Sequence, residues 1–264
     1  MDAAEFLGLE PTHNPHRWYL PVSAGIATGA QFLFGGCGLA AAIEAMERVL
    51  ERDVVWATAQ YLSYATVGEV VDLDVTVATT GHYTSQARVV AHVGDREILT
   101  VNAGLGERPG DDRQWDTPID VPPPEQCPER QIRPGMAGSL MHRLDMRLAR
   151  GSQWDDLRPD AVPDGRSALW VRLPEIEMSA AALAILGDYV PYGISQALGR
   201  WMRSNSLDNT MRIQRVVPTD WVLLDIAVHG VHRGFGHGRV HQWNHDGVLL
   251  ATASQTAIVR DVAG

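Results

Sequence analysis

A group of five histidines lies near the end of the sequence, at a spacing that could hold a metal ion. His229 and His232 flank an expected strand end, while His237 and His241 follow on the next expected strand, and His245 comes after it. No carboxylate or cysteine accompanies them at a standard zinc spacing. We therefore interpret them as the solvated face of a hairpin, with a pH-responsive surface as the alternative, and expect no metal site.

Cys37 is a second candidate for chemistry, because a thiolate near a helix start would be stabilised and could act as a nucleophile. No histidine or aspartate can be assigned as its partner, so a small buried residue is the preferred interpretation. Cys127 is the other cysteine. Two distant cysteines indicate neither a disulfide framework nor structural zinc, and both are expected to be free thiols.

Charge and hydropathy exclude several classes of protein. The net charge is -10 and the 22 basic residues are scattered, which argues against nucleic acid as a partner. The opening residues 1–10 contain Asp2 and Glu5 where a secretory signal would be basic, and no apolar run reaches membrane-spanning length. We expect a cytoplasmic protein that does not bind membranes.

A proline- and charge-rich stretch divides the chain near its middle. Residues 107–133 show no apolar periodicity and include three consecutive prolines, so they are interpreted as a linker between an N-terminal unit, 1–106, and a C-terminal unit, 134–264. The two units match at a constant spacing of 151 positions, for example Gly36 with Gly187 and Asp74 with Asp225. The pattern predicts a duplication without gaps.

Each copy is expected to contain one helix followed by an antiparallel meander. The apolar pattern predicts helices at 36–51 and 187–204. Alternating residues predict three strands in each copy, with hairpin turns at 94–95 and 246–247. The expected strands are 70–78, 84–92, 97–103, 221–229, 238–243 and 248–258. The fold class is therefore α+β, with a sheet able to wrap each helix.

Four ordered motifs carry a resemblance to a known family. They are Phe34-Gly35-Gly36, Gly187-Asp188-Tyr189, Ser206-Leu207-Asp208-Asn209 and Ser254-Gln255. Together they resemble the acyl-CoA thioesterase II family of double-hotdog proteins over most of the chain. The resemblance implies a tandem (double) hotdog, with two antiparallel sheets each wrapping a central helix. It also implies a hydrolase of fatty acid metabolism that converts acyl-CoA to free acid and CoA without a cofactor.

The resemblance further implies that Asp188, Ser206 and Gln255 hold the attacking water. A thioester carbonyl is already activated, so a water polarised by a carboxylate base and oriented by two neutral groups can attack it directly. Gly36 is the expected source of an N–H for the oxyanion. For Asp188 the structural alternative is simple capping of a helix N-terminus.

The duplication predicts a single active site in each chain. At a spacing of 151 positions, the first copy offers Cys37, Val55 and Gly104 opposite the three polar residues. The family usually carries a polar residue such as Gln at position 37, so the cysteine is a departure that affects the shape of the pocket.

Two arginines beside the glycine-rich segment 234–238, Arg233 and Arg239, are expected to meet the CoA phosphates, because an acidic protein needs local cations to bind a polyanion. A homo-oligomer is expected by analogy with the family. A hotdog hydratase or dehydratase, and a non-catalytic acyl-CoA-binding module, are the alternative functions.

Overall fold

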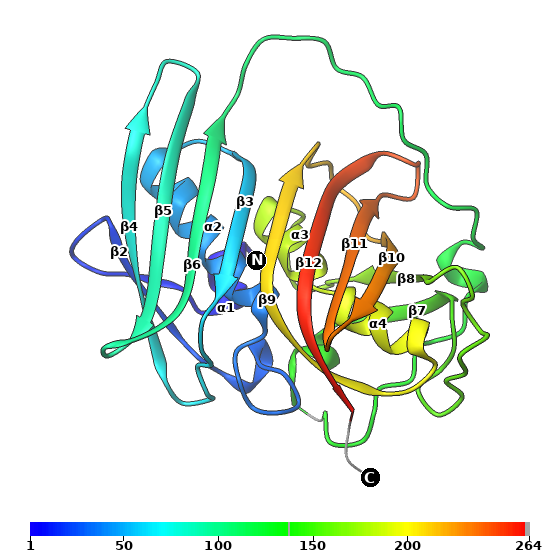
Figure 1. The fold of residues 1–264 in the computed structure, drawn as a ribbon. Helices are drawn as coiled ribbons and strands as arrows, with labels where there is room; N and C mark the ends of the chain where they lie inside the picture. Colours follow the sequence, from blue (N-terminus) through cyan, green and yellow to red (C-terminus); the bar gives the residue numbers. More distant parts are fainter. Residues whose placement is uncertain (137, 262–264) are drawn as a thin grey trace.

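One antiparallel sheet runs through the whole molecule, a computed structural model that describes residues 1–136 and 138–261. Within these residues twelve strands follow the order β1-β2-β4-β5-β6-β3-β9-β12-β11-β10-β8-β7 (Figure 1). The strands are β1 Glu10–Pro11, β2 Arg17–Pro21, β3 Val54–Tyr61, β4 Val70–Thr80, β5 Thr84–Val93, β6 Arg96–Gly106, β7 Asp145–Arg150, β8 Arg166–Arg172, β9 Met202–Ile213, β10 Val222–His232, β11 Phe235–Trp243 and β12 Leu249–Asp261.

Helices cover one face of this sheet (Figure 1). The α-helices are α1 Ala3–Leu7, α2 Gly35–Leu50, α3 Ala180–Leu186 and α4 Val190–Leu198, and short 3-10 turns occur at Ala24–Ile26, Pro124–Gln126 and Leu140–Arg143. The stripe predicted for this helix is Leu39, Ile43, Met46 and Leu50; the first three are fully buried on α2, and Leu50 at its end is half-buried against the core. Burial of this stripe against the sheet is the main driving force for the first half.

The second predicted helix, over 187–204, is wrong in its extent. Only α4, Val190–Leu198, falls within that range, because α3 has already ended at Leu186 and α4 is stopped by Gly199, whose φ of 61° is a left-handed conformation. Residues 202–204 already belong to β9. Glycine stops a helix at such a position because it lacks the Cβ that would clash. The interruption leaves Asp188 between the two helices.

The six predicted strands are all present, within a few residues of their expected ends, and both expected turns are found. The prediction of two sheets is wrong, since β3 and β9 pair with each other and join the halves into one sheet. Thr58 and Thr210 face each other across this junction, with their hydroxyl oxygens 2.6 Å apart. Sequence patterns predict strands but do not specify which edges pair.

The duplication is visible in the β-bulges, and it corrects the gapless register. Between β4 and β5 the extra residue is Ala78, and between β10 and β11 it is His229, which lies 151 positions later. The bulges of β3 and β9 fall at Val55 and Leu207, a spacing of 152, as for the facing pair Thr58 and Thr210. Equivalent residues are therefore 152 positions apart in the inner strands β3 and β9, but 151 positions apart in the outer strands β4, β5, β10 and β11.

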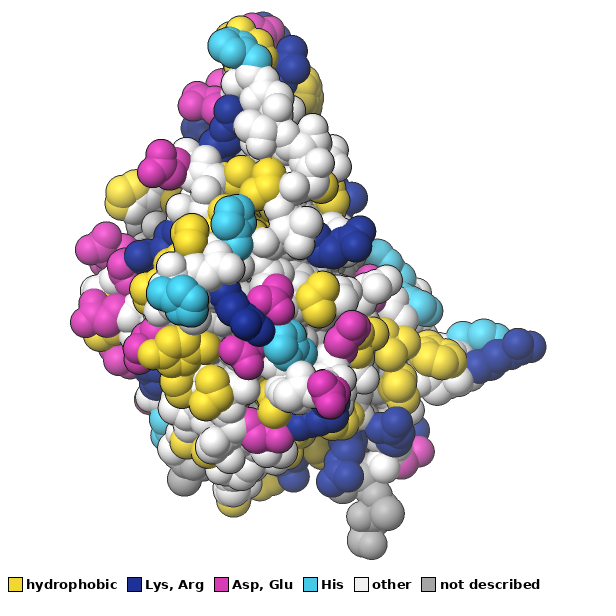
Figure 2. Space-filling view, turned by 90° about the vertical axis from the view of Figure 1, so that its left-hand side faces the viewer, with side chains coloured by type: hydrophobic (Ala, Val, Ile, Leu, Met, Phe, Trp, Pro, Cys, Tyr) yellow, Lys and Arg dark blue, Asp and Glu magenta, His cyan; other side chains and the backbone are white. Residues whose placement is uncertain are grey.

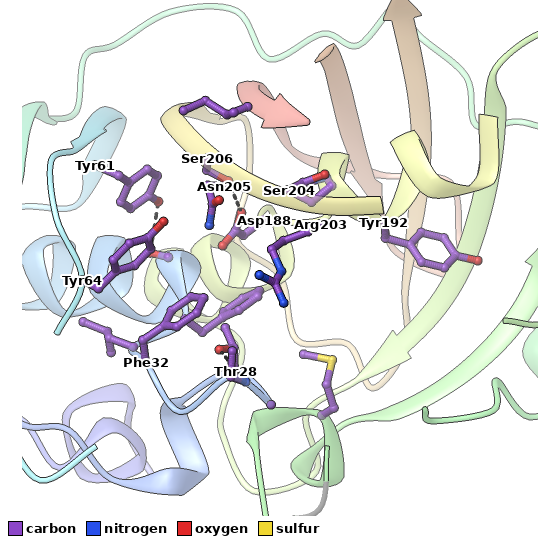
Figure 3. Close-up of a pocket in the computed structure, with 18 of the residues that line it drawn as sticks. Thr28, Phe32, Tyr61, Tyr64, Asp188, Tyr192, Arg203, Ser204, Asn205 and Ser206 are labelled. Carbon is purple, nitrogen blue, oxygen red and sulfur yellow. Dashed lines mark hydrogen bonds between the residues drawn. The ribbon is translucent and has the colours of Figure 1, made fainter. Parts of the chain in front are cut away.

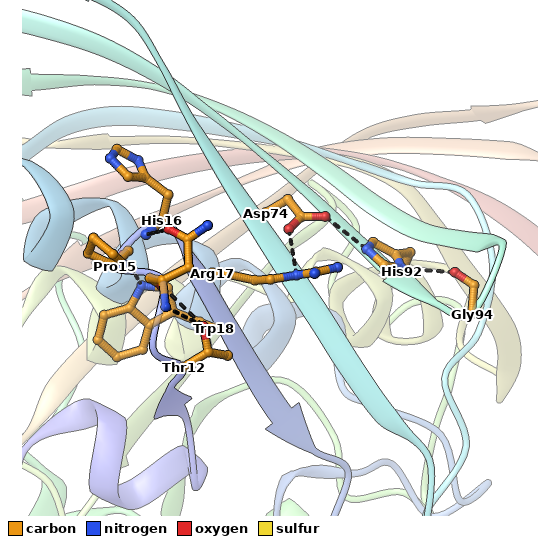
Figure 4. Close-up of polar contacts among 9 residues, drawn as sticks. Thr12, Pro15, His16, Arg17, Trp18, Asp74, His92 and Gly94 are labelled. Atoms are coloured by element: carbon orange, nitrogen blue, oxygen red, sulfur yellow. Dashed lines mark hydrogen bonds and ion pairs between the residues drawn. The ribbon is translucent and has the colours of Figure 1, made fainter.

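A buried or half-buried aspartate is bound by an arginine at matching places in the two halves. In the first half Asp74 on β4 contacts Arg17 on β2 at 3.0 Å and His92 on β5 at 2.9 Å (Figure 4). The carboxylate raises the pKa of His92 by hydrogen bonding to it. In the second half Asp225 on β10 contacts Arg166 on β8 at 3.1 Å. These pairs attach β2 and β8, the strands next to the two edges, to the rest of the sheet.

The segment between the halves passes over the molecule from β6 towards the far strands (Figure 1). Residues 107–123 contain no helix or strand. Gln114 hydrogen-bonds to Gly247 and Leu249, and Ile119 and Val121 pack with a second, smaller apolar cluster that includes Trp170 and Trp243. The segment is therefore attached to the C-terminal half by polar and apolar contacts.

The surface carries both signs of charge. Acidic, basic, histidine and apolar side chains are interspersed on the face shown in Figure 2. Among the described residues, no helix has the length and apolar character needed to cross a lipid bilayer.

Gly36 makes the close approach of α2 to α3, and replacing it should destabilise the fold. A Cβ at Gly36 would lie 2.9 Å from the carbonyl oxygens of Ala184 and Ile185. We expect Gly36→Ala to lower the free energy of unfolding by about 1–3 kcal/mol through overpacking. Urea denaturation would measure it, with Gly110→Ala as control, since that Cβ would meet nothing within 4 Å. Equal stability of both variants would contradict the close packing of the helices.

Candidate active site

A cavity of about 600 Å³ lies between the two halves and is lined by both of them. The N-terminal half contributes Phe32, Tyr61 and Tyr64, while the C-terminal half contributes Asp188 and residues of β9 (Figure 3). Most of the wall is apolar, and the centroids of the Phe32 and Tyr64 rings are 4.9 Å apart. An apolar cavity with few converging polar groups is typical of a small-molecule site.

Asp188 lies in the break between α3 and α4, where its carboxylate reaches the start of α2. The residue is 7% exposed, and its Oδ2 accepts a hydrogen bond of 2.8 Å from the Gly36 N–H. The N-cap residue of α2, Phe34, provides no side-chain cap. Asp188 therefore caps a helix, as the structural alternative expected, but the helix belongs to the other half of the chain. The same residue also lies on the cavity wall.

Ser206 and Gln255 come from the neighbouring strands β9 and β12 and meet the same carboxylate. The Ser206 hydroxyl is 3.5 Å from Asp188 Oδ1, and the Gln255 amide donates to that oxygen. The same amide nitrogen lies 3.2 Å from the Ser206 oxygen. The Val190 N–H donates to Gln255 Oε1 at 3.1 Å, which fixes the orientation of the amide. The three side chains predicted from sequence thus lie together.

Burial of the Asp188 carboxyl raises its pKa to about 6, and the hydrogen bonds from Gln255, Gly36 and Ser206 partly oppose that rise. The charged form loses hydration in the interior, while each donor stabilises it. A carboxylate with such a pKa can accept a proton near neutral pH and release it again, as a general base requires.

Two glycines make the approach of Asp188 to α2 sterically feasible. A Cβ on Gly35 would lie 2.8 Å from the Asp188 carboxylate and 3.1 Å from the ring of Tyr61. The Tyr61 hydroxyl donates a 3.0 Å hydrogen bond to the Gly35 carbonyl. The two glycines of the motif Phe34-Gly35-Gly36 are therefore required sterically, because a side chain at either position would displace the Asp188 carboxylate or α3.

The first copy has no polar residues at the positions that match Asp188, Ser206 and Gln255. The corrected register changes which residues of the first copy occupy two of these positions. Cys37 is fully buried, and burial strongly raises the pKa of its thiol, as expected for a packing residue rather than a nucleophile. The strand offset of 152 places Val54 opposite Ser206 and Ala103 opposite Gln255, in place of Val55 and Gly104. Val55 instead matches Leu207, the other bulged residue.

None of the three residues that were expected to bind substrate, Gly36, Arg233 and Arg239, lines the cavity. The Gly36 N–H is bound to Asp188. Arg239 lies 3.8 Å from the buried Asp225 on the sheet, and Arg233 occupies the β10–β11 turn with a φ of 50°. Neither arginine lines the cavity.

The histidines lie on the C-terminal strands and in the turns that follow them. His237 contacts Thr256 at 3.2 Å, and His241 lies 3.8 Å from Asp116 of the connecting segment. Within the described part of the chain, no three His, Cys, Asp or Glu side chains gather as metal ligands.

Three arginines that the sequence analysis did not single out line the cavity: Arg130, Arg133 and Arg203. Arg130 and Arg133 lie in the stretch that was interpreted as a linker, and Arg203 falls in the predicted helix 187–204, although it belongs to β9. The one available signal was the position of Arg203 three residues before Ser206.

Comparison with known proteins places the chain among thioesterases. Residues 23–106 match the sequence profile of the acyl-CoA thioesterase N-terminal domain, and residues 124–259 match that of the C-terminal domain. A search of curated proteins finds no significant match.

Several solved structures are similar over nearly the whole chain. A candidate thioesterase from Novosphingobium aromaticivorans is 30% identical, with a TM-score of 0.86 over 96% of this chain and 98% of that one. A hot dog fold protein from Alicyclobacillus acidocaldarius is 21% identical, with a TM-score of 0.86 over 99% and 98%. The acyl-CoA thioesterase II TesB2 from Mycobacterium marinum is 20% identical, with a TM-score of 0.77 over 99% of both chains.

The raised pKa of Asp188 predicts a specific dependence of stability on pH. The folded state binds this proton more tightly than the unfolded state, whose pKa is near 3.8, so the stabilisation is present at low pH and is lost as pH rises towards 6. We expect the stability of Asp188→Asn relative to the wild type to increase by about 2–3 kcal/mol between pH 4 and pH 7. Urea unfolding at each pH would measure it, and a constant difference would exclude a raised pKa.

Proposed function

The chain belongs to the acyl-CoA thioesterase family and is a hydrolase, and from this premise we propose that Asp188, Ser206 and Gln255 activate the water that cleaves the thioester. The observation that carries the proposal is a buried carboxylate with a pKa of about 6, which two neutral side chains contact on the wall of an apolar cavity. The hotdog fold agrees with this activity, and the proposed arrangement is a pair of hotdogs that share one sheet.

In the proposed reaction the water oxygen forms a bond to the thioester carbonyl carbon as Asp188 accepts a water proton. Ser206 and Asp188 both line the cavity, so a water on the cavity side can contact both side chains. Collapse of the tetrahedral intermediate breaks the C–S bond, and the leaving thiolate takes the proton from Asp188. The products are the free acid and CoA, and no covalent acyl-enzyme is formed.

For the oxyanion we propose the Gly35 N–H in place of Gly36. Gly35 is the first residue of α2 and lines the cavity, and its N–H has no acceptor within the described part of the chain. A helix N-terminus adds a favourable dipole for a developing negative charge. Gly36 then serves the base, because its N–H holds the Asp188 carboxylate.

Three expectations from the sequence remain proposals. The first is the division into units 1–106 and 134–264 with the linker 107–133. The second is a homo-oligomer, and the third is a role in cytoplasmic fatty acid metabolism. Support for the first comes from the mirrored strand order on either side of the β3–β9 junction.

The base assignment predicts loss of thiol release when Asp188 is replaced. We expect Asp188→Ala to reduce kcat on acyl-CoA by about 10²–10⁴, as for other general bases, and Ser206→Ala and Gln255→Ala to reduce it less. Free thiol would be followed with acyl-CoAs of several lengths. Cys37→Ala is the control and should retain activity, because its buried thiol contributes no nucleophile.

The outcomes of this assay separate the alternative functions. Loss of an enoyl-CoA double bond without thiol release would identify a hydratase, and acyl-CoA binding without either reaction would identify a binding module. Full activity of Asp188→Ala would refute the assignment of the base.

The base must be ionised to act, so activity should rise with pH. We expect kcat/KM to increase through an apparent pKa of about 6 and to level off above it, because the carboxylate loses its proton over that range. A pH–rate profile with a neutral-pH plateau would agree. A profile that stays flat from pH 5 to pH 8 would show that Asp188 does not titrate in the rate-determining step.

A further inference from the structure

One wall of the cavity carries a group of cations that is unusual for this acidic protein. Arg130, Arg133 and Arg203 all line the cavity. Within the described residues none of them lies within 4.0 Å of a carboxylate, whereas Arg172 and Arg200, for example, each contact an aspartate. Three arginines without a carboxylate partner thus line one cavity of a chain whose net charge is -10. The wall is therefore suited to an anionic ligand.

Aromatic rings hold two of these arginines in place without neutralising them. The Arg133 guanidinium lies 4.0 Å from the centroid of the Trp201 ring and 5.9 Å from that of Trp154. The Arg130 guanidinium lies 4.7 Å from the centroid of the Tyr192 ring. Stacking engages the face of the guanidinium and leaves its N–H edge able to bind two oxygens of a phosphate.

Two buried hydroxyls on the same wall lack partners. The oxygens of Tyr192 and Ser204 are inaccessible to solvent and make no hydrogen bond within the described chain, and both residues line the cavity. A buried hydroxyl without a partner is uncommon, because its polar atom loses its hydration without gaining a hydrogen bond. Both residues nevertheless contribute other atoms to the lining of the cavity beside the arginines.

The cationic wall and the aromatic wall lie on different sides of Asp188. In Figure 3 Phe32 and Tyr64 lie to one side of the carboxylate, Tyr192 lies to the other, and the Arg203 side chain extends from β9 into the cavity. A smaller hollow beyond Arg130 and Tyr192 is lined by Trp154 and Trp201. A substrate that reacts at Asp188 can thus place an apolar end and a charged end in separate parts of the cavity.

We propose that Arg130, Arg133 and Arg203 bind the phosphate groups of the CoA portion, while the acyl chain lies against Phe32 and Tyr64. The inference rests on the proposed function and deepens it. Arg203 and Ser204 lie three and two residues before Ser206 on the same strand, which rises about 3.3 Å per residue. They are therefore a short distance along β9 from the reacting carbonyl.

The test compares two substrates with the same acyl group, acyl-CoA and acyl-pantetheine, which lacks the phosphates. We expect Arg203→Gln and Arg133→Gln each to raise KM for acyl-CoA about 10-fold, because a hydrogen bond to a charged group contributes about 1.5 kcal/mol or more. The kcat on acyl-CoA, and both constants on acyl-pantetheine, should remain within about twofold. Salt should raise KM for acyl-CoA in the wild type more than in the variants.

Two further variants make the comparison specific. Arg88→Gln, on the outer strand β5, is the control and should behave as the wild type. Arg233→Gln tests the β10–β11 hairpin that the sequence suggested. If KM for acyl-CoA alone rises in this variant and does not rise in Arg203→Gln and Arg133→Gln, the phosphates bind at the hairpin and the proposal is overturned. Equal losses on both substrates for the cavity variants would also overturn it, because they would indicate a structural role.

Binding of CoA itself separates this inference from the proposed function. Calorimetric titration with CoA should give a Kd about 10-fold weaker for Arg203→Gln and Arg133→Gln than for the wild type. A wild type that binds CoA in this way but releases no thiol would refute the hydrolytic mechanism and leave the phosphate site supported. Unchanged Kd values in both variants would refute the phosphate site whatever the activity.

Discussion

The hydrogen bond from the Gly36 N–H to the Asp188 carboxylate joins the start of α2 in one half to the α3–α4 break in the other. It requires two glycines at the start of α2, a break between α3 and α4, and a sheet that holds both halves at a fixed distance. The helix gains a cap and the carboxylate gains a donor that partly offsets its burial. The same contact therefore stabilises the fold and sets the proton affinity of the proposed base.

The single sheet explains why each chain builds its site from both halves. Pairing of β3 with β9 brings Tyr61 and the start of α2 next to β9 and β12, which carry Ser206 and Gln255. The matched bulges at Val55 and Leu207 show that both copies keep the same strand geometry. What differs is the chemistry, since the first copy places Val54 and Ala103 where the second places the serine and the glutamine. Duplicated backbones with divergent side chains thus leave one polar set.

The cavity is divided in polarity as a CoA thioester is. Its aromatic wall comes from the N-terminal half, and its cationic wall comes from residues 130–133 and the start of β9. Arg133 stacks on Trp201 and Arg130 stacks on Tyr192, so their positions depend on α4 and on the segment that follows its end. The segment between the halves therefore also leads into the arginine-bearing wall of the cavity.

The sequence by itself determined the local elements and the identity of the polar residues. Apolar periodicity predicted α2 and six strands, and the ordered motifs selected Asp188, Ser206 and Gln255, because such signals depend on neighbours along the chain. Tertiary structure alone decided that the halves share one sheet and that the inner strands are offset by one residue more. It also brought Arg130, Arg133 and Arg203 to one cavity and made Asp188 the cap of a helix in the other half. Strand pairing, burial and the position of distant charges depend on contacts between residues far apart in sequence, which no local pattern encodes.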